Sequence, residues 1–188
     1  MRTLQLRVLE ESTLALRFGG NNAHLSPKRG IQYYGPFNLP SEKRVLLRFV
    51  YPRINGAVEN ALNAFKEILV QGGETFPGFQ ELYRVNDVRL LGDVCISTED
   101  LFKPEGSVLE NVAKEDMTIT PKPVYVVVIP PYPTWYRNSP YYTLKAYLLK
   151  HGILSQMIRT ATLTRNRKVL EETAFNIANA IFAKAGGE

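Results

Sequence analysis

Cysteine is almost absent from this sequence, because Cys95 is the single cysteine among 188 residues. One cysteine excludes a disulfide within the chain and any metal site built from several cysteines. The sequence also lacks an apolar run of the roughly 18–20 residues that a membrane-spanning helix requires. Its first residues, MRTLQLRVLEEST, carry charges where a signal peptide needs an apolar stretch. These absences favour a cytoplasmic protein with no membrane partner.

The sequence motifs of common nucleotide-binding enzymes are missing as well. No G-x-G-x-x-G follows the first buried strand that we predict, and G-x-x-x-x-G-K-[ST] is absent, so dinucleotide and P-loop sites lack support. The two histidines are His24 and His151, and the position of His151 at a predicted helix end favours a surface or capping residue over a catalytic base. Glu99 and Asp100 are adjacent carboxylates that could bind a metal ion, but a solvated turn fits them better. We therefore expect no enzymatic activity and no catalytic residues.

Positive charge is in excess, with a formal net charge of +5 and a sequence pI of about 9.3. This excess favours an anionic partner, but only mildly. Lys and Arg are spread along the sequence without a basic tail. A pocket for one or two phosphates suits this distribution better than a broad nucleic-acid groove.

The first part of the chain, residues 1–44, has the composition of a linker segment. Residues 4–17 alternate loosely and could form a strand or a hairpin. Residues 19–30 and 33–44 are dense in Gly, Pro, Asn and Ser, which is typical of turns and loops. A regular pattern begins at Val45, so we predict one folded domain over residues 45–188.

Within that domain, predicted strands alternate with predicted helices. Val124 to Val128 are five consecutive apolar residues, which indicates a strand buried on both faces, as in a parallel sheet. Ser139 and Pro140 form a strong helix start, and Ser107 with Glu110 has the spacing of a capping box. The predicted strands cover residues 45–52, 86–97, 123–131 and 153–163, and the predicted helices residues 55–73, 107–116, 139–150 and 168–185. This order predicts an α/β fold, Rossmann-like, in which a small parallel sheet is flanked by helices and binds ligands beyond the carboxyl ends of its strands.

Four polar residues near the C-terminal end of the sequence form the candidate site. Tyr141 and Lys145 are four residues apart, so they share one face of the predicted helix, near its N-terminus. An anion there would meet backbone N–H groups, an ammonium group and a phenol hydroxyl. Gln156 lies at the start of the next predicted strand, and Lys184 continues the apolar stripe of the last helix. Each residue alone has an ordinary structural explanation, and their joint occurrence favours a binding site.

The ordered set of these motifs resembles the MID domain of Argonaute proteins, and the prokaryotic branch is the best match. The resemblance rests on Tyr141-x3-Lys145, on Gly152–Ile153 followed by Ser155–Gln156, and on AFNIANAIFAKAGG at residues 174–187. IQYYGPFNLP at residues 31–40 is similar to the segment that enters that domain. No single motif is specific, but the resemblance spans residues 30–187.

The resemblance implies that the domain binds the 5′-phosphorylated end of a short guide RNA or DNA in a silencing or defence system. Tyr141 would bond the 5′ phosphate and stack on the first base, while Lys145 and Lys184 would neutralise the phosphate. Gln156 would complete the pocket and help to hold a Mg²⁺ ion. The loop at Arg137 and Asn138 would contact the base.

The resemblance also implies a partner, the PIWI domain of the parent chain, which supplies a carboxylate to the metal ion and carries the acidic residues of target cleavage. The sequence ends at GGE, so we expect the metal site in this chain to be incomplete. Ala180 stands where eukaryotic relatives have another lysine, which favours the metal-using prokaryotic form. Two alternatives stay open: a protein-interaction module, and a Rossmann-like enzyme domain that binds a mononucleotide.

Overall fold

The computed structural model describes residues 15–53, 56–131 and 139–188. Most of the predicted strand or hairpin at residues 4–17 lies outside these ranges. The described strands are β1 (Leu16–Phe18), β2 (Asn22–His24), β3 (Arg44–Pro52), β4 (Asp87–Leu90), β5 (Val94–Ile96), β6 (Val124–Ile129) and β7 (Ser155–Arg159). The described helices are the 3-10 turn η1 (Gly19–Asn21), α1 (Pro27–Tyr34), α2 (Gly56–Gln71), α3 (Phe79–Tyr83), α4 (Val108–Asp116), α5 (Pro140–Lys150), α6 (Thr160–Leu163) and α7 (Arg167–Lys184).

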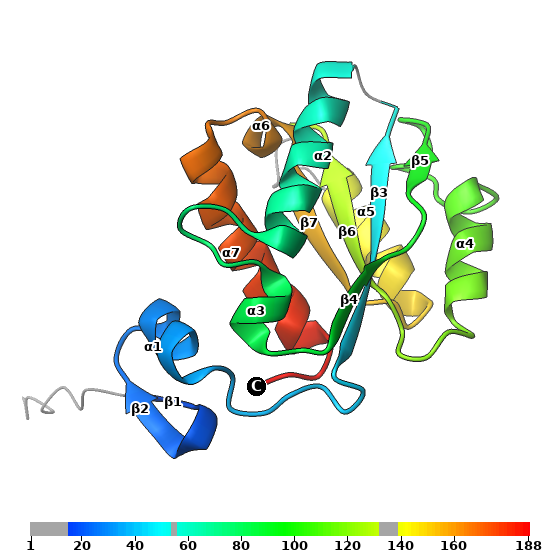
Figure 1. Cartoon of the computed structure of the whole chain (residues 1–188). Coiled ribbons are helices and arrows are strands. Elements are labelled where there is room, and N and C mark those ends of the chain that lie inside the picture. The colour runs from blue at the N-terminus through cyan, green and yellow to red at the C-terminus, as the bar shows by residue number, and fades with distance from the viewer. Residues whose placement is uncertain (1–14, 54–55, 132–138) are drawn as a thin grey trace, which may run out of the picture.

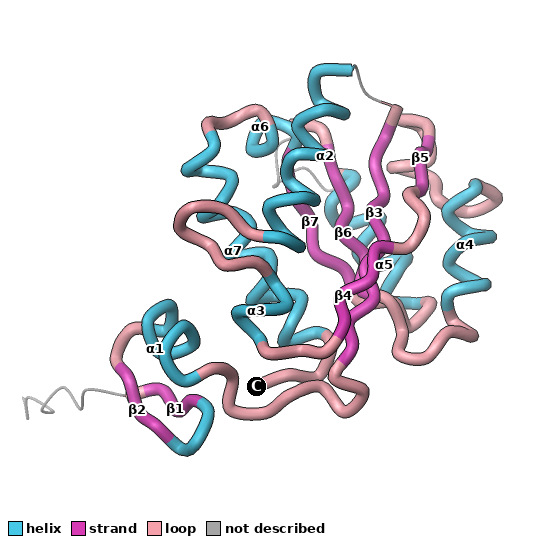
Figure 2. The backbone as a smooth tube through the Cα atoms, in the orientation of Figure 1, coloured by secondary structure: helices cyan, strands magenta, loops and turns pink. Residues whose placement is uncertain are grey.

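A parallel sheet of five strands forms the centre of the molecule, as the sequence predicts (Figures 1 and 2). Its order is β4-β3-β6-β7, and β5 also pairs with β3, beyond the end of β4. The single strand predicted at residues 86–97 is therefore two short strands. Arg48 on β3 occupies the break between them, where its Nη1 donates to the carbonyl of Gly92 at 2.5 Å. Among the described strands of this sheet, β7 ends the order opposite β4.

Strand β6 is buried on both faces along its whole length, which confirms the prediction from its apolar run. Val124, Val126 and Val128 belong to the core on the side of α2, α3 and α7. Tyr125, Val127 and Ile129 belong to the core on the side of α4 and α5. The alternation of strand side chains thus builds two cores, one on each face of the sheet. Helices α5 and α7 consequently lie on opposite faces of β7.

Helix α5 starts as its sequence predicts. The Oγ of Ser139 accepts a hydrogen bond from the Tyr141 N–H at 3.3 Å, and Pro140 occupies the first helical position. Gly152, with a φ of +67°, ends the helical segment in the left-handed conformation that favours glycine. This turn leads directly into β7, so the chain passes from α5 to the edge of the sheet within a few residues.

Three local predictions are wrong. Residues 19–34 form η1, β2 and α1 instead of loops, and α1 begins with Ser26 and Pro27, the same start signal that α5 has. Ser107 is the N-cap residue of α4, but the predicted capping box does not form, because its hydroxyl donates to the carbonyl of Pro104 at 2.6 Å and Glu110 accepts from the Gly106 N–H. Strand β7 ends at Arg159, because the backbone turns into the short helix α6.

The described part of the linker segment packs against the domain instead of leaving it. Phe18 and Ile31 belong to the same core as Phe182 of α7. The backbone of Asn38 pairs with that of Glu188 through two hydrogen bonds of 2.8 and 3.0 Å, so the first part of the described chain and its last residue lie side by side (Figure 1). The boundary between a linker and a domain at residues 44 and 45 stays a prediction. None of the described helices is both long and apolar enough to cross a lipid bilayer.

Candidate functional site

Tyr141 and Lys145 form a pair on α5, one turn apart. The Nζ of Lys145 donates to the Tyr141 hydroxyl at 3.2 Å and lies 5.2 Å from the centroid of the Tyr141 ring. The ring is partly buried against the core of the α4 and α5 face, whereas Lys145 is exposed. The core therefore fixes the phenol while the ammonium group stays accessible to a ligand.

Gln156 and Lys184 form a second pair between β7 and the end of α7. The Nζ of Lys184 donates to Oε1 of Gln156 at 3.2 Å and to the carbonyl of Ala180 at 3.3 Å. Ile158, two residues after Gln156, belongs to the core on the α7 side. Because strand side chains alternate, Gln156 faces α7 as well, which explains how it reaches Lys184.

The two pairs meet around the edge of the sheet. Burial lowers the pKa of the Lys184 ammonium below its ordinary value of 10.5; the positive charge of Lys145 lowers this pKa further, while Tyr141 raises it. The charge of Lys145 thus acts on Lys184, although the two lysines belong to helices on opposite faces of the sheet. Within the described residues, neither lysine forms an ion pair with a carboxylate. The structure thus joins the four predicted residues in two hydrogen-bonded pairs, and their role in binding stays a prediction.

Their position differs from the predicted one. Gln156 is the second residue of β7, and Lys184 lines a cavity at the amino ends of β3 and β6. The site thus lies beside the amino-terminal half of the edge strand and not beyond the carboxyl ends of the sheet. The reason is that α7 runs antiparallel to β7, so its last turn returns to the start of that strand.

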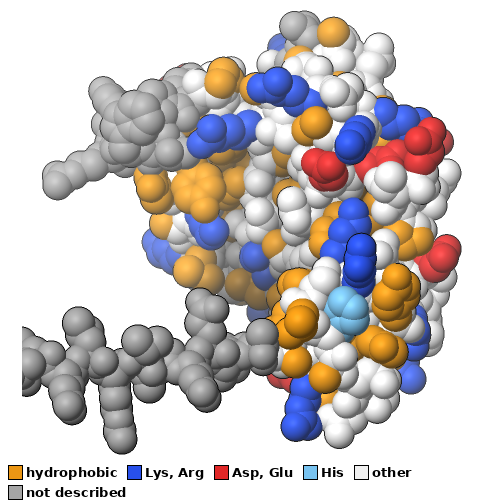
Figure 3. Space-filling model, turned by 90° about the vertical axis from the view of Figure 1, so that its left-hand side faces the viewer, with side chains coloured by type: hydrophobic (Ala, Val, Ile, Leu, Met, Phe, Trp, Pro, Cys, Tyr) orange, Lys and Arg blue, Asp and Glu red, His pale blue; other side chains and the backbone are white. Residues whose placement is uncertain are grey.

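Figure 3 shows one side of the molecule on which Lys and Arg are spread widely, while acidic side chains lie toward its right-hand edge.

The remaining predicted site residues are outside the described ranges. Arg137 and Asn138 belong to residues 132–138, so the predicted contact with a base stays a prediction. Sequence reasoning missed the Ala180 carbonyl, which positions Lys184. The helical spacing of four residues between Ala180 and Lys184 is the signal that could have identified it.

The residues around Gln156 do not form a Mg²⁺ site by themselves. Mg²⁺ prefers six oxygen ligands in octahedral geometry. Gln156 supplies one amide oxygen, and that oxygen accepts from the cationic Lys184. No cluster of at least three His, Cys, Asp or Glu side chains suited to a metal occurs in the described part of the chain. A metal ion here would need oxygens from a bound phosphate and from elsewhere.

Asp100 and His151, which we considered as possible residues of an enzyme site, both contact neighbouring residues of their own turn or helix. Asp100 accepts a hydrogen bond from the Ser97 N–H at 2.9 Å, and the Asp100 N–H donates to the Ser97 hydroxyl at 3.1 Å, so they close a turn. His151 is the C-terminal cap residue of α5, and its Nδ1 lies 2.9 Å from the Tyr147 carbonyl. These contacts agree with the structural interpretation of both residues.

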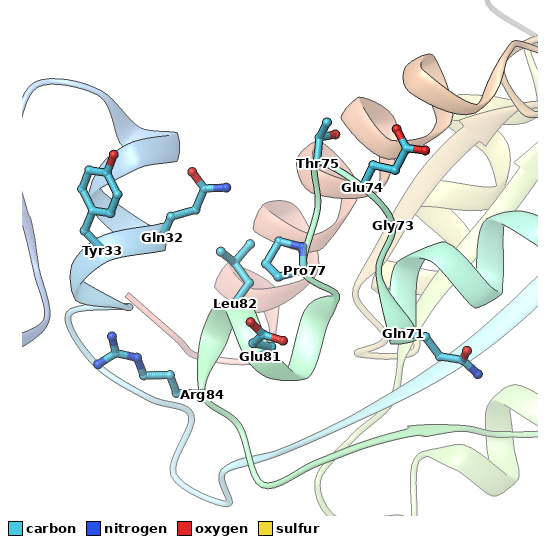
Figure 4. A pocket seen from close by; sticks show the side chains of 10 residues that line it. All are labelled: Gln32, Tyr33, Gln71, Gly73, Glu74, Thr75, Pro77, Glu81, Leu82 and Arg84. Carbon is cyan, nitrogen blue, oxygen red and sulfur yellow. The ribbon is translucent and has the colours of Figure 1, made fainter.

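A wider cavity of about 780 Å³ opens between α1 and the connection from α2 to α3 (Figure 4). Tyr33 and Gln32 of α1 lie across it from Leu82 and Glu81 of α3, and Glu74 also lines it. The charged side chains of the lining are Arg84 and the two carboxylates of Glu74 and Glu81, and this excess of negative charge disfavours a phosphate ligand. This cavity is therefore a less suitable place for a nucleic-acid terminus than the four-residue site.

The comparisons with known proteins agree on one family. No protein-family model matches the sequence. A protein argonaute from Cereibacter sphaeroides (strain ATCC 17025 / ATH 2.4.3) is 29% identical over 170 residues, which cover 85% of this chain and 21% of that protein. The chain is homologous to Argonaute proteins. It spans about a fifth of the length of this Argonaute relative, and the matched region is consistent with a MID domain.

Solved Argonaute structures share the fold of this Argonaute homologue. Clostridium butyricum Argonaute, bound to a guide DNA and a target DNA, matches with a TM-score of 0.58 and 19% identity over 90% of this chain and 23% of that one. Kluyveromyces polysporus Argonaute with a guide RNA matches with a TM-score of 0.57 and 16% identity over 84% of this chain and 18% of that one. At sequence identities this low, the similarity shows only that the folds are alike.

Proposed function

We propose that this Argonaute homologue binds the 5′-phosphorylated end of a short guide RNA or DNA at Tyr141, Lys145, Gln156 and Lys184. The observation that carries the proposal is the pair of contacts Lys145–Tyr141 and Lys184–Gln156 on the two faces of the edge strand β7, with no carboxylate paired to either lysine in the described chain. Uncompensated positive charges that converge on one place are stabilised by an anion. Homology to Argonaute proteins supports a guide strand as the source of that anion.

The chemistry of the site favours a strand terminus over an internal phosphate. A terminal phosphate carries a charge of about −1.5 to −2 at pH 7, more than the single charge of an internal diester. Lys145 and Lys184 would both donate charge-assisted hydrogen bonds to it, and the Gln156 amide and the Tyr141 hydroxyl would donate two more. In the structure Lys145 covers the Tyr141 ring, so stacking of a base on Tyr141 requires the ammonium group to move toward the phosphate. Phosphate binding and base stacking would then be coupled.

In this proposal, a divalent metal ion binds to the site only when the guide phosphate is bound as well. The phosphate would bring oxygens that the protein residues lack, and Gln156 would turn its amide oxygen from Lys184 to the ion. The partner PIWI domain would supply the further carboxylate that the family resemblance implies. In this proposal the chain holds the strand and catalyses no reaction.

The test is a titration of four ligands: a nucleoside 5′-monophosphate, the corresponding nucleoside, and one oligonucleotide with either a 5′ phosphate or a 5′ hydroxyl. Lys145→Ala should weaken binding of the phosphorylated oligonucleotide about 10- to 100-fold, the equivalent of roughly 1.5–3 kcal/mol for a charge-assisted contact. The 5′-hydroxyl oligonucleotide should lose less than about twofold. Titration with and without Mg²⁺ should show tighter phosphate binding when the ion is present.

Lys150→Ala is the matched control, because Lys150 is exposed on the same helix and does not contact the site residues. Equal losses for phosphorylated and hydroxyl ends would contradict a terminal-phosphate pocket. If none of the four ligands binds the wild-type chain, a protein-interaction module becomes the better explanation. Turnover of a bound mononucleotide would instead support the enzyme alternative.

A further inference from the structure

Helix α5 is apolar on two opposite faces. Its inner face packs into the core through Leu144, Tyr147 and Leu148, which are at most 5% exposed. Its outer face carries Tyr142 and Leu149, which are 50% and 61% exposed. A helix on the surface of a protein normally presents polar side chains to water, so an apolar stripe on its outer face indicates a surface that a partner covers.

The outer face of α5 has the residue spacing of a helix-packing site. Tyr142, Lys145, Ala146 and Leu149 stand at positions i, i+3, i+4 and i+7, and all four are exposed. In packed helices, four residues with this spacing form the hole that receives one side chain of the facing helix. Ala146 is the smallest of the four, so it leaves room for such a side chain. We call these four residues the α5 docking face.

Lysines lie on both sides of the apolar stripe. With 3.6 residues in each turn, Lys145 is displaced to one side of the line from Tyr142 to Leu149, and Lys150 is displaced to the other side. Both lysines are exposed, and within the described residues neither forms an ion pair with a carboxylate. The docking face is therefore an apolar stripe with a positively charged edge on each side.

This charge pattern distinguishes between the possible occupants. In a symmetric dimer through α5, the lysines of both copies would meet at the edges of the interface and repel each other. A nucleic-acid base could stack on the Tyr142 ring, but it would leave the aliphatic side chain of Leu149 exposed. A helix whose own apolar seam is bordered by carboxylates would bury the stripe and also pair with Lys145 and Lys150.

We propose that the α5 docking face binds an amphipathic α-helix of a partner protein, in which Asp or Glu residues border the apolar seam. One apolar side chain of that helix enters the space above Ala146, between Tyr142 and Leu149, and the carboxylates face the lysines. This inference goes beyond guide binding and does not depend on it, although Lys145 takes part in both sites.

The experiment uses three labelled peptides of about 18 residues, which is five helical turns. The acidic peptide has leucines at helical spacing with Glu on both sides of them, the basic peptide has Lys in place of each Glu, and the third peptide has the composition of the acidic one in scrambled order. Binding is measured by fluorescence anisotropy. The wild-type chain should bind the acidic peptide at least about tenfold more tightly than either of the others.

Two substitutions test the apolar and the charged part of the docking face. Leu149→Gln should weaken binding of the acidic peptide about tenfold, because it removes apolar area from the interface. The matched control is Leu25→Gln, since Leu25 is 65% exposed and lies between β2 and α1; it should change the affinity by less than about twofold. Lys150→Glu should weaken binding of the acidic peptide and strengthen binding of the basic one.

Three results overturn the proposal: equal binding of the acidic and the scrambled peptide, equal losses for Leu149→Gln and Leu25→Gln, and a peptide preference that Lys150→Glu does not change. Analytical ultracentrifugation tests the second copy, and a dimer that Leu149→Gln dissociates would make another molecule of this chain the occupant instead. Co-sedimentation with phosphatidylserine vesicles, if Leu149→Gln abolishes it, would assign the face to a membrane. No measurement uses a nucleotide, so failure here is separate from failure of the proposed function.

Discussion

Lys184 is a cation whose environment opposes its charge until an anion arrives. Its burial and the nearby Lys145 lower its pKa from the ordinary 10.5. A bound phosphate would reverse this effect, because a negative charge favours the protonated ammonium. Ligand binding and proton binding at Lys184 are therefore linked.

This linkage predicts the pH dependence of affinity for a nucleoside 5′-monophosphate. Affinity should rise from about pH 5 to pH 7, since the second pKa of a phosphate is about 6 and the dianion binds better. It should fall again in the alkaline range, at a lower pH than an ordinary lysine would give, as Lys184 loses its proton. Calorimetric titrations at several pH values measure both limbs. In Lys184→Met the acidic limb should persist, and the alkaline limb should move to higher pH; an unmoved alkaline limb would contradict the role of Lys184.

At the scale of elements, one carboxylate connects α7 to the segment between α2 and α3. Glu171 is only 2% exposed, and it accepts hydrogen bonds from the hydroxyl and N–H of Thr75, both at 2.7 Å, from the Glu74 N–H and from Arg167. The Thr75 hydroxyl, followed by the backbone donors, lowers the pKa of Glu171 to about 2. This segment also forms one wall of the cavity in Figure 4.

A folded-state pKa below the ordinary 4.5 means that Glu171 stabilises the fold fully above about pH 4.5 and loses this effect as the pH falls toward 2. Glu171→Gln should lower the free energy of unfolding by about 1.5–3 kcal/mol at pH 7, because charge-assisted hydrogen bonds are lost. Urea unfolding should show a smaller difference between variant and wild type at about pH 3. The exposed neighbour provides the control, Glu172→Gln, which should change stability little. A difference that is equal at both pH values would argue against the ionised carboxylate.

How well the sequence predicts the structure also differs from one helix or strand to the next. The β6 strand and α5 were predictable because their signals are local: a continuous apolar run, and a Ser-Pro start with a Gly stop. The same Ser-Pro signal at Ser26 was outweighed by the surrounding Gly, Pro and Asn, so α1 was missed. The four site residues were found through family resemblance and helical spacing. Their location beside the amino half of β7 depends on the path of α7 across the sheet, which no local pattern reveals.

At the scale of the whole molecule, the described part of residues 1–44 contributes Phe18 and Ile31 to the main core. Phe18 is 7% exposed in the main core, and a Cβ on Gly30 would be 2.1 Å from its ring, so helix α1 needs a glycine where it crosses Phe18. Phe37, in contrast, is 45% exposed. The two phenylalanines of one segment thus make a matched pair for mutation.

Phe18→Ala should lower the free energy of unfolding by about 3–5 kcal/mol, the usual cost of removing a buried phenylalanine. Phe37→Ala should change it by less than about 0.5 kcal/mol. Chemical denaturation followed by circular dichroism should show one transition for both variants. Two separate transitions, or an unchanged stability of Phe18→Ala, would mean that residues 15–44 fold apart from the rest, as a linker would.

Among the described strands, β7 ends the sheet, and this position has a consequence for association between molecules. An uncovered outer strand offers unpaired backbone groups on which another chain can add a strand, and positively charged side chains next to such a strand oppose this addition. Lys145 and Lys184 flank β7 from both faces, so two copies of the protein that approach through this strand would repel each other. The residues that we assign to holding a phosphate would, in its absence, also disfavour the pairing of two copies through β7.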